Sequence, residues 1–336
     1  MAVVAVAVVV AAGAVVALEH DGGETGCYSR RSTTKPAYPG RSASRVYDWT
    51  DVDAQTTSRF GAAVALPDAL LEGRYVPQGL AGWPNWDGSG ESLLLISAYH
   101  DGDADKAADG PSAVFAVVAD GPRAGTSAGR MLVDPGHVGG LVVHRGWLYV
   151  GSEHEIRGYR LDAVRRALPE GGDDLQPTEY RRSSTHDVAN LGSGDGRLWA
   201  GRYTKTGSSP LTGYVQTDAR AGTLELQADA GILVPPKTQG LTVTADQTIS
   251  STSYGRLSRG TLRVVPRGST AARSYCFRVP SMNEGLTVLD GRLYLLFESA
   301  ARTYDRGLLR PANVIPEVQS ASLTDITSLP AEGPTD

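Results

Sequence analysis

Polar side chains that can bind ligands or transfer protons recur shortly before five leucines of this chain. Carboxylate and amide oxygens can coordinate a hard cation, and imidazoles can act as bases near neutral pH. All three groups can also hydrogen-bond a polar ligand. The leucines are Leu80, Leu141, Leu191, Leu241 and Leu286, and the polar residues before them are Gln78, His137, His186, Asp187, Gln239, Asn283 and Glu284.

A second set of polar and aromatic residues ends the apolar run that follows each leucine. Tyrosine offers both a flat apolar face and a hydroxyl, a combination that suits sugars and similar ligands. This set consists of Tyr99, His100, Glu153, His154, Tyr203, Lys205, Tyr254, Arg256 and Glu298.

Metal-assisted hydrolysis is one chemistry that these residues can support. Asp187, Asn283 and Glu284 can supply oxygen ligands to Ca²⁺. The bound cation would polarise an ester, lactone or phosphoester for attack by water, with His137 or His186 as the base. A zinc site is the weaker metal hypothesis, because no histidine spacing matches a local zinc motif.

Two other chemistries remain open. Glycoside hydrolysis needs two carboxyl groups about 5–10 Å apart. Alternatively, the tyrosines, amides and Arg256 can bind a sugar without any catalysis. The carboxylate pairs available for glycoside hydrolysis are Asp187 with Glu284 and Glu153 with Glu298.

The five leucines mark a repeat of 45 to 61 residues, and the repeat contains the elements that must position these side chains. Each leucine opens an apolar strand, and in three repeats an Asp-Gly or Arg-Gly turn leads into an aromatic strand. Further short strands follow in most repeats. A period near 50 with several strands in each unit is typical of a β-propeller. The sequence therefore predicts an all-β, five-bladed β-propeller, with a single sheet sandwich as the competing fold.

The fifth repeat is irregular after Tyr304, so its outer strand needs another source. Phe60–Leu66 can supply it and remove the open edge of the ring. A sixth, degenerate blade built from residues 59–75 and the tail after 305 is the alternative. A short helix is predicted at Asp162–Leu168.

The N-terminal part differs from the repeats. Residues 1–18 are uncharged and apolar, so they predict a signal peptide or a signal-anchor. Residues 19–58 are predicted to form a flexible tail, and residues 59–330 the propeller. We therefore expect a secreted protein, or one anchored to the membrane by the uncleaved segment. Cys27 and Cys276 can form one disulfide in that compartment, although two unpaired thiols fit the sequence equally well.

The composition limits the classes of binding partner that we expect. The net charge is −5, and no block of Lys and Arg is present, so nucleic acid is excluded as an expected partner. We expect a monomer that contacts a membrane only through an uncleaved N-terminal segment.

The segment Asn283–Glu298, with Asn-Glu-Gly-Leu followed by Asp-Gly-Arg-Leu-Tyr, resembles one blade of the secreted phytase-like esterase and SMP-30/gluconolactonase propellers. In those families, Glu-Gly-Leu or Glu-Gly-Ile opens an inner strand, and its acid commonly serves a central divalent metal. The resemblance implies such a role for Glu284 alone, and Ca²⁺ as a possible cofactor.

From these observations we expect the innermost strands to bring both sets of polar residues to one face around the axis. The sequence favours binding of a small polar or carbohydrate ligand in a pocket at that face. Metal-assisted hydrolysis is the first alternative, and a scaffold that binds another protein on its rim is the second.

Overall fold

The computed structural model describes residues 60–101, 110–152, 155–169, 179–182, 188–219, 223–267, 275–305, 311 and 314–327. Residues 1–59 lie outside this part of the chain, and Cys27 with them. Export, anchoring, the flexible tail and the disulfide therefore stay predictions. Among the described residues, no helix is long and apolar enough to span a bilayer.

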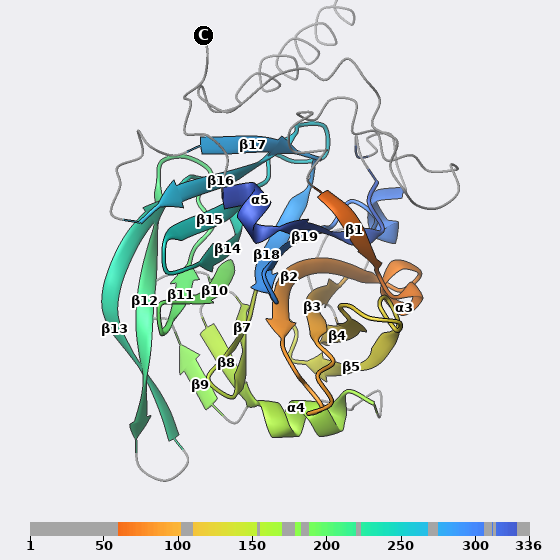
Figure 1. Cartoon of the computed structure of the whole chain (residues 1–336), viewed down its shortest axis with the longest axis horizontal. Helices are drawn as coiled ribbons and strands as arrows, with labels where there is room; N and C mark the ends of the chain where they lie inside the picture. The colour runs from red at the N-terminus through yellow and green to blue at the C-terminus, as the bar shows by residue number, and fades with distance from the viewer. Residues whose placement is uncertain are drawn as a thin grey trace, which may run out of the picture.

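The described residues form a five-bladed β-propeller, as the sequence predicted (Figure 1). Every blade is a four-stranded antiparallel sheet. The blades, written from the axis outward, are β2 (Tyr75–Trp83), β3 (Leu93–His100), β4 (Ser112–Val118), β5 (Ser127–Val133); β6 (Gly140–His144), β7 (Trp147–Ser152), β8 (Glu155–Arg160), β9 (Glu179–Arg182); β10 (Asn190–Gly194), β11 (Arg197–Gly201), β12 (Ser209–Ala219), β13 (Thr223–Val234); β14 (Thr238–Val243), β15 (Gln247–Thr252), β16 (Gly260–Pro266), β17 (Tyr275–Val279); and β18 (Asn283–Leu289), β19 (Arg292–Phe297), β20 (Glu317–Ser322), β1 (Phe60–Ala65).

The first strand of the chain closes the ring. β1 pairs antiparallel with β20, with Val64 opposite Val318, and so forms the outer edge of the last blade. The prediction that Phe60–Leu66 completes the fifth repeat is confirmed. The alternative of a sixth blade is wrong, because β1 and β20 are both used in the fifth sheet.

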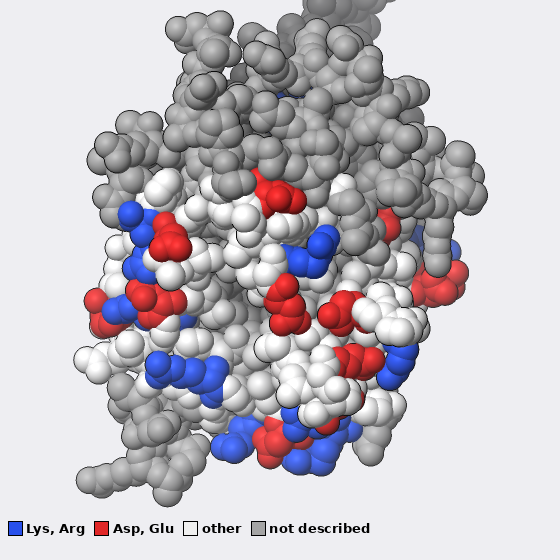
Figure 2. Space-filling view, in the orientation of Figure 1, with Lys and Arg blue, Asp and Glu red and all other residues white. Residues whose placement is uncertain are grey.

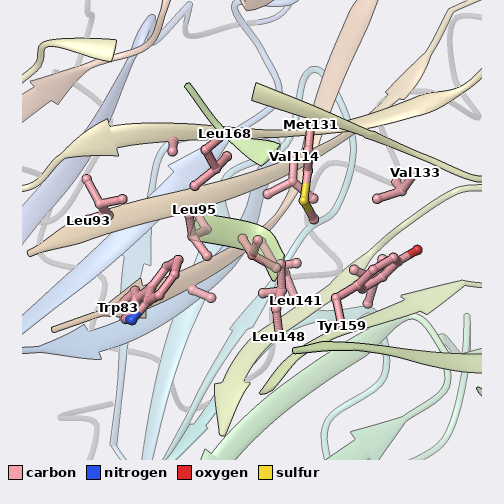
Figure 3. Close-up of a cluster of buried hydrophobic side chains, with 14 of the residues drawn as sticks. Trp83, Leu93, Leu95, Val114, Met131, Val133, Leu141, Leu148, Tyr159 and Leu168 are labelled. Carbon is pink, nitrogen blue, oxygen red and sulfur yellow. The ribbon is translucent and has the colours of Figure 1, made fainter. Parts of the chain in front are cut away.

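Short helices occupy the connections between strands. α3 (Asp68–Leu71) follows β1, α4 (Leu161–Ala167) follows β8, η3 (Arg302–Asp305) follows β19, and α5 (Leu323–Thr327) follows β20. α4 confirms the predicted helix, shifted by one residue. Leu168, just after it, packs with Met131 and Tyr159 in the core between the first two blades (Figure 3).

The predicted tight turns join the two inner strands of three blades. Both turn residues have positive φ at Arg145–Gly146, Asp195–Gly196 and Asp290–Gly291, with the glycines at 84°, 71° and 73°. Two successive residues with positive φ characterise the hairpin turn that matches the twist of the flanking strands. The three turns therefore fix the register in which each aromatic second strand pairs with its inner strand.

The third blade departs from the predicted lengths. The sequence predicted only short strands after the second strand of each repeat, but β12 and β13 run for 11 and 12 residues. β11 pairs only with Leu211–Tyr214 of β12, so the remainder of the hairpin extends beyond the inner strands (Figure 1).

Close approach of the inner strands explains the Gly-Leu repeat. These strands contact one another around the axis in the order β2, β6, β10, β14, β18 and back to β2. A Cβ on Gly240 would lie 2.6 Å from the backbone nitrogen of Leu286, and one on Gly285 would overlap the backbone nitrogen of Leu80. In β10 the glycine follows the leucine, and Gly192 makes the same kind of contact. Small residues at these positions let the five strands close the ring.

We expect Gly240→Ala to lower the free energy of unfolding by about 1–3 kcal/mol, the usual cost of overpacking a tight contact. Denaturation in guanidinium chloride measures this loss. Gly231→Ala is the matched control, because its Cβ would meet its nearest neighbour at an ordinary 3.7 Å. Equal midpoints for the two variants would contradict this account of the repeat.

Charged residues on the molecular surface are mixed in sign. Figure 2 shows Lys and Arg interspersed with Asp and Glu on the visible face. Several form exposed pairs, including Arg197 with Asp229 at 2.8 Å and Arg267 with Asp195 at 2.8 Å. Exposed pairs of this kind contribute little to stability, so the fold depends on the packed blades.

Candidate functional site

A bulge between the two inner strands of the fifth blade brings two glutamates together. Asn283 pairs with Phe297 and Leu286 pairs with Leu295, so two residues of β18 face a single residue of β19. Glu284 lies in this bulge, and Glu298 directly follows β19. Bulges commonly redirect a side chain next to a functional site. Here the bulge brings the two carboxyl groups into direct hydrogen-bonding contact.

Side chains from three blades hydrogen-bond the glutamate pair. Gln78 Nε2, from the first blade, donates to Glu298 Oε2 at 2.9 Å, and Tyr304 Oη donates to the same oxygen at 2.8 Å. Gln239 Nε2, from the fourth blade, donates to Glu284 Oε1 at 3.1 Å. Glu284 is only 2% exposed, and Glu298 is half-buried. The pair therefore forms a polar junction among the first, fourth and fifth blades.

The glutamate pair retains protons at neutral pH. Burial raises the pKa of Glu284 well above its usual value, and the neighbouring charge of Glu298 raises it further. Burial also raises the pKa of Glu298, to about 7, although hydrogen bonds from Tyr304 and Gln78 oppose the rise. Two adjacent buried carboxyl groups cannot both ionise readily. Glu284 is therefore the proton donor of the pair, and Glu298 carries the charge when one is present.

Two tyrosines extend this network. Burial, followed by the charge of Glu298, raises the pKa of Tyr99 to about 12 and that of Tyr304 beyond the usual range. Both hydroxyls therefore keep their protons at neutral pH. Tyr99 hydrogen-bonds Tyr304, and its ring lies 4.8 Å from that of His137. The chain of contacts leads from Glu298 through two phenols to the exposed His137.

Four other predicted residues lie on the fourth and third blades. Arg256 sits over the ring of Tyr304, with its Cζ 4.7 Å from the ring centroid. Tyr254 is half-buried. Tyr203 and Lys205 are exposed. Burial and the charge of Glu284 raise the pKa of Tyr203, so this side chain lies within electrostatic range of the glutamate pair.

The remaining predicted residues are placed differently. Asn283 is fully buried, and its side chain lies against Gly260 of the neighbouring blade. His100 is half-buried and packs edge-on against Tyr75, with the ring centroids 5.5 Å apart. The other predicted residues lie outside the described part of the chain, namely Glu153, His154, His186 and Asp187.

Sequence reasoning missed two residues that contact the site. Tyr304 lies in η3, in the segment where the fifth repeat loses its regular pattern. Lys237 lies in the turn before β14 with a φ of 61°, and its Nζ is 4.9 Å from the centroid of Tyr254. The turn Val234–Thr238 parallels that before β18, where Met282 has a φ of 60°. A comparison of these two turns in the sequence could have identified Lys237.

Removing the Tyr304 hydroxyl tests how much this hydrogen-bond network stabilises the fold. We expect Tyr304→Phe to reduce the free energy of unfolding by about 1.5–3 kcal/mol at pH 8, because it removes a hydrogen bond to a charged group. At pH 5, where Glu298 is neutral, the loss should be smaller. Urea denaturation at both pH values measures the difference, with Tyr75→Phe as control. An equal loss at both pH values would argue against a charged Glu298.

Metal coordination has limited support from the described residues, which contain no group of three or more His, Cys, Asp or Glu suited to an ion. Glu284 and Glu298 supply two carboxyl groups, and the amides of Gln78 and Gln239 supply further oxygens. Asp187, the other predicted ligand, is not among the described residues. Carboxylate and amide oxygens are the kinds of ligand that a hard cation such as Ca²⁺ prefers.

The five leucines of the repeat line an axial cavity of about 210 Å³. Hydroxyl groups of Ser193, Thr242, Thr244 and Thr287 also lie in its lining. All of these polar residues follow the leucines in the chain, whereas Gln78, Gln239 and Glu284 precede them. The leucine layer therefore separates this cavity from the glutamate pair.

Comparison with known proteins finds solved structures that share little sequence with this chain. No family model matches the chain, and no curated protein matches it in sequence. Among solved structures, it is similar to the GH43_1 enzyme from Xanthomonas citri, at 12% identity and a TM-score of 0.46 over 80% of this chain and 92% of that one. An aldose sugar dehydrogenase from Streptomyces coelicolor, solved with PQQ bound, matches at 12% identity and a TM-score of 0.39 over 79% and 97%.

The WD40 domain of coronin from Toxoplasma gondii matches at 14% identity and a TM-score of 0.35 over 70% of this chain. This chain spans 55% of the length of that protein. Likeness at this level carries no argument about activity. The strand order alone establishes that this chain is a five-bladed β-propeller.

Proposed function

We propose that this protein binds a small polar ligand, a carbohydrate, around Glu298 at the axial face of the propeller. One observation carries the proposal: a glutamate pair, two amides and two phenols from different blades converge beside the axis. Sugar hydroxyls both donate and accept hydrogen bonds, so they are matched by carboxylates and amides. Tyrosine rings add flat apolar surface for the faces of the sugar.

The position of the site supports the same reading. Ligand sites favour places where several elements meet, and side chains from three blades meet at the glutamate pair. Export belongs to this proposal, because a secreted protein meets glycans outside the cell. A monomeric state is proposed with it.

A glycan array followed by titration calorimetry tests the proposal. We expect wild-type protein to bind at least one glycan, and Glu298→Gln to bind it at least tenfold more weakly, because the amide cannot supply the carboxylate charge. Glu72→Gln is the matched control, since Glu72 is an exposed residue at the end of α3. Unchanged affinity in Glu298→Gln would remove this residue from the site.

Calcium-assisted hydrolysis is the second candidate. The observation that favours it is the proton that Glu284 donates to Glu298. A divalent cation can displace a proton held between two carboxyl groups, because ligands must be deprotonated to bind metal. A carboxyl group with a pKa of about 7 also suits acid–base catalysis at neutral pH. Elemental analysis, with melting curves in Ca²⁺ and after EDTA, separates the candidates. One equivalent of metal and a chelator-sensitive melt would favour the hydrolase, and their absence would favour simple binding.

A further inference from the structure

Another cavity lies between the third and fourth blades. Its volume is about 800 Å³, within the range of about 300–1,000 Å³ that is usual for small-molecule sites. β12 and β13 line one side of it, and β15 and β16 line the other. Its described lining includes no residue of the proposed carbohydrate site. This cavity is therefore a second place where a ligand can bind.

Apolar packing between these two blades stops close to the axis. The core cluster at this boundary joins third-blade residues such as Trp199 to Leu241 and Val243 of β14. Among the described residues, this cluster contains none from β15 or β16. Apolar residues of those two strands, such as Ile249 and Leu262, pack with the fifth blade instead. Outward of β14, the third and fourth blades therefore enclose the cavity rather than a packed core.

The fourth blade presents a mainly polar wall to the cavity. Thr248 pairs with Val265, and Ser250 pairs with Arg263. Paired residues share a face of the sheet, and all four of these line the cavity. Three of the four side chains are polar, and a guanidinium donates hydrogen bonds but accepts none. This wall therefore suits a group that accepts hydrogen bonds.

The third blade presents an apolar wall. Leu211 pairs with Ile232 across β12 and β13, and Val234 lies two residues further on the same face. All three line the cavity, and Ile232 is only half-buried. Leu233, which also lines it, is 73% exposed. Burying this accessible apolar surface against a hydrocarbon would be favourable.

We propose that this cavity binds an acyl chain. The hydrocarbon part lies against Leu211 and Ile232, and the carbonyl or carboxylate oxygens accept hydrogen bonds from Thr248 and Arg263. A purely apolar ligand would bury the polar wall without hydrogen bonds, which is unfavourable. A sugar would bury its hydroxyls against the apolar wall at a similar cost. A ligand with one apolar and one accepting part matches both walls, and its binding is independent of the carbohydrate site.

The proposal does not require an unpaired arginine. Both arginines of the lining, Arg263 and Arg267, also interact within the protein, and Arg267 pairs with Asp195 at 2.8 Å. A guanidinium carries N–H donors on three nitrogens. It can therefore bind the oxygens of a ligand in addition to its present partners.

A free fatty acid and an acyl ester share this chemistry. Displacement of cis-parinaric acid, a fluorescent fatty acid, by decanoate or by methyl decanoate distinguishes the two sources. Decyltrimethylammonium is the matched control ligand, because it has the same chain but a cationic head group without an acceptor. We expect decanoate to bind at least about tenfold more tightly than this control, since only decanoate can accept charge-assisted hydrogen bonds.

Variants of the two walls locate the bound chain. Ile232→Trp should fill part of the cavity and weaken decanoate binding at least about tenfold, because the added ring takes the place of the hydrocarbon. Gln227→Trp is the matched control, since Gln227 is exposed on the same strand and is not among the residues that line the cavity. Arg263→Gln should weaken binding of decanoate about tenfold and that of methyl decanoate by less.

Each outcome supports or overturns the inference. Displacement by decanoate alone identifies a fatty acid as the ligand, and displacement by both compounds extends the site to acyl esters. Failure of both to displace the probe, or equal displacement by decyltrimethylammonium, would overturn the proposal. Unchanged affinity in both Ile232→Trp and Arg263→Gln, with melting temperatures that show folded protein, would also overturn it. Glycan binding by Ile232→Trp should match that of wild type, which separates this site from the carbohydrate site.

Discussion

Truncating Phe60 to alanine should lower the free energy of unfolding by about 3–5 kcal/mol, the usual cost of removing a buried phenylalanine side chain. Phe60 is 3% exposed and packs in a core cluster with Leu293 and Phe297 of the fifth blade. It belongs to the strand that closes the ring. Its loss therefore weakens both the core and the attachment of β1 to β20. Chemical denaturation followed by tryptophan fluorescence measures the change.

The control for this prediction is an exposed apolar residue. Leu233 is 73% exposed, so Leu233→Ala should change stability by less than about 0.5 kcal/mol. If Phe60→Ala were equally mild, β1 would contribute little to the fold, and the ring would be held by the inner strands alone. Limited proteolysis adds a second readout, because a loosened β1 would be cut before the rest of the propeller.

The repeat made most of the fold predictable. Gly-Leu strands at regular spacing and Asp-Gly turns impose local conformations, so blade number and inner hairpins followed from the sequence. The source of the outer strand was also predictable, because a closed ring cannot leave one blade incomplete. The lengths of β12 and β13 were not predictable, because no local sequence pattern marks how far these strands extend beyond their pairing with β11.

The sequence did not predict the contact between Glu284 and Glu298. It offered Asp187 with Glu284 and Glu153 with Glu298 as candidate pairs, and Asp187 and Glu153 lie outside the described residues. The structure pairs Glu284 with Glu298, because a bulge between Asn283 and Leu286 shifts the register. Strand patterns predict alternation, and a bulge interrupts alternation without an obvious sequence signal. Tyr304 was missed for a similar reason, since it is positioned by η3 after the regular strand ends.

The glutamate pair should make the propeller less stable as pH rises from about 4.5 to 7. The pKa of Glu298 is raised from 4.5 to about 7 in the folded protein, so the folded state binds more protons than the unfolded state in this window. The free energy of unfolding then decreases with pH by up to about 1.4 kcal/mol per pH unit, and the total is on the order of 3 kcal/mol. The raised pKa of Glu284 has the same sign and extends the loss to higher pH.

Comparison with the double variant Glu284→Gln/Glu298→Gln separates this effect from the effects of other titrating groups. Burial, followed by the charge of Arg145, lowers the pKa of His144 to about 4, so this histidine makes stability rise with pH between about 4 and 6.5. That opposing contribution is common to both proteins and cancels in the difference. Unfolding free energies measured at pH 5, 6, 7 and 8 should diverge in favour of the double variant as pH rises. Parallel curves would mean that the two carboxyl groups titrate normally in the folded protein.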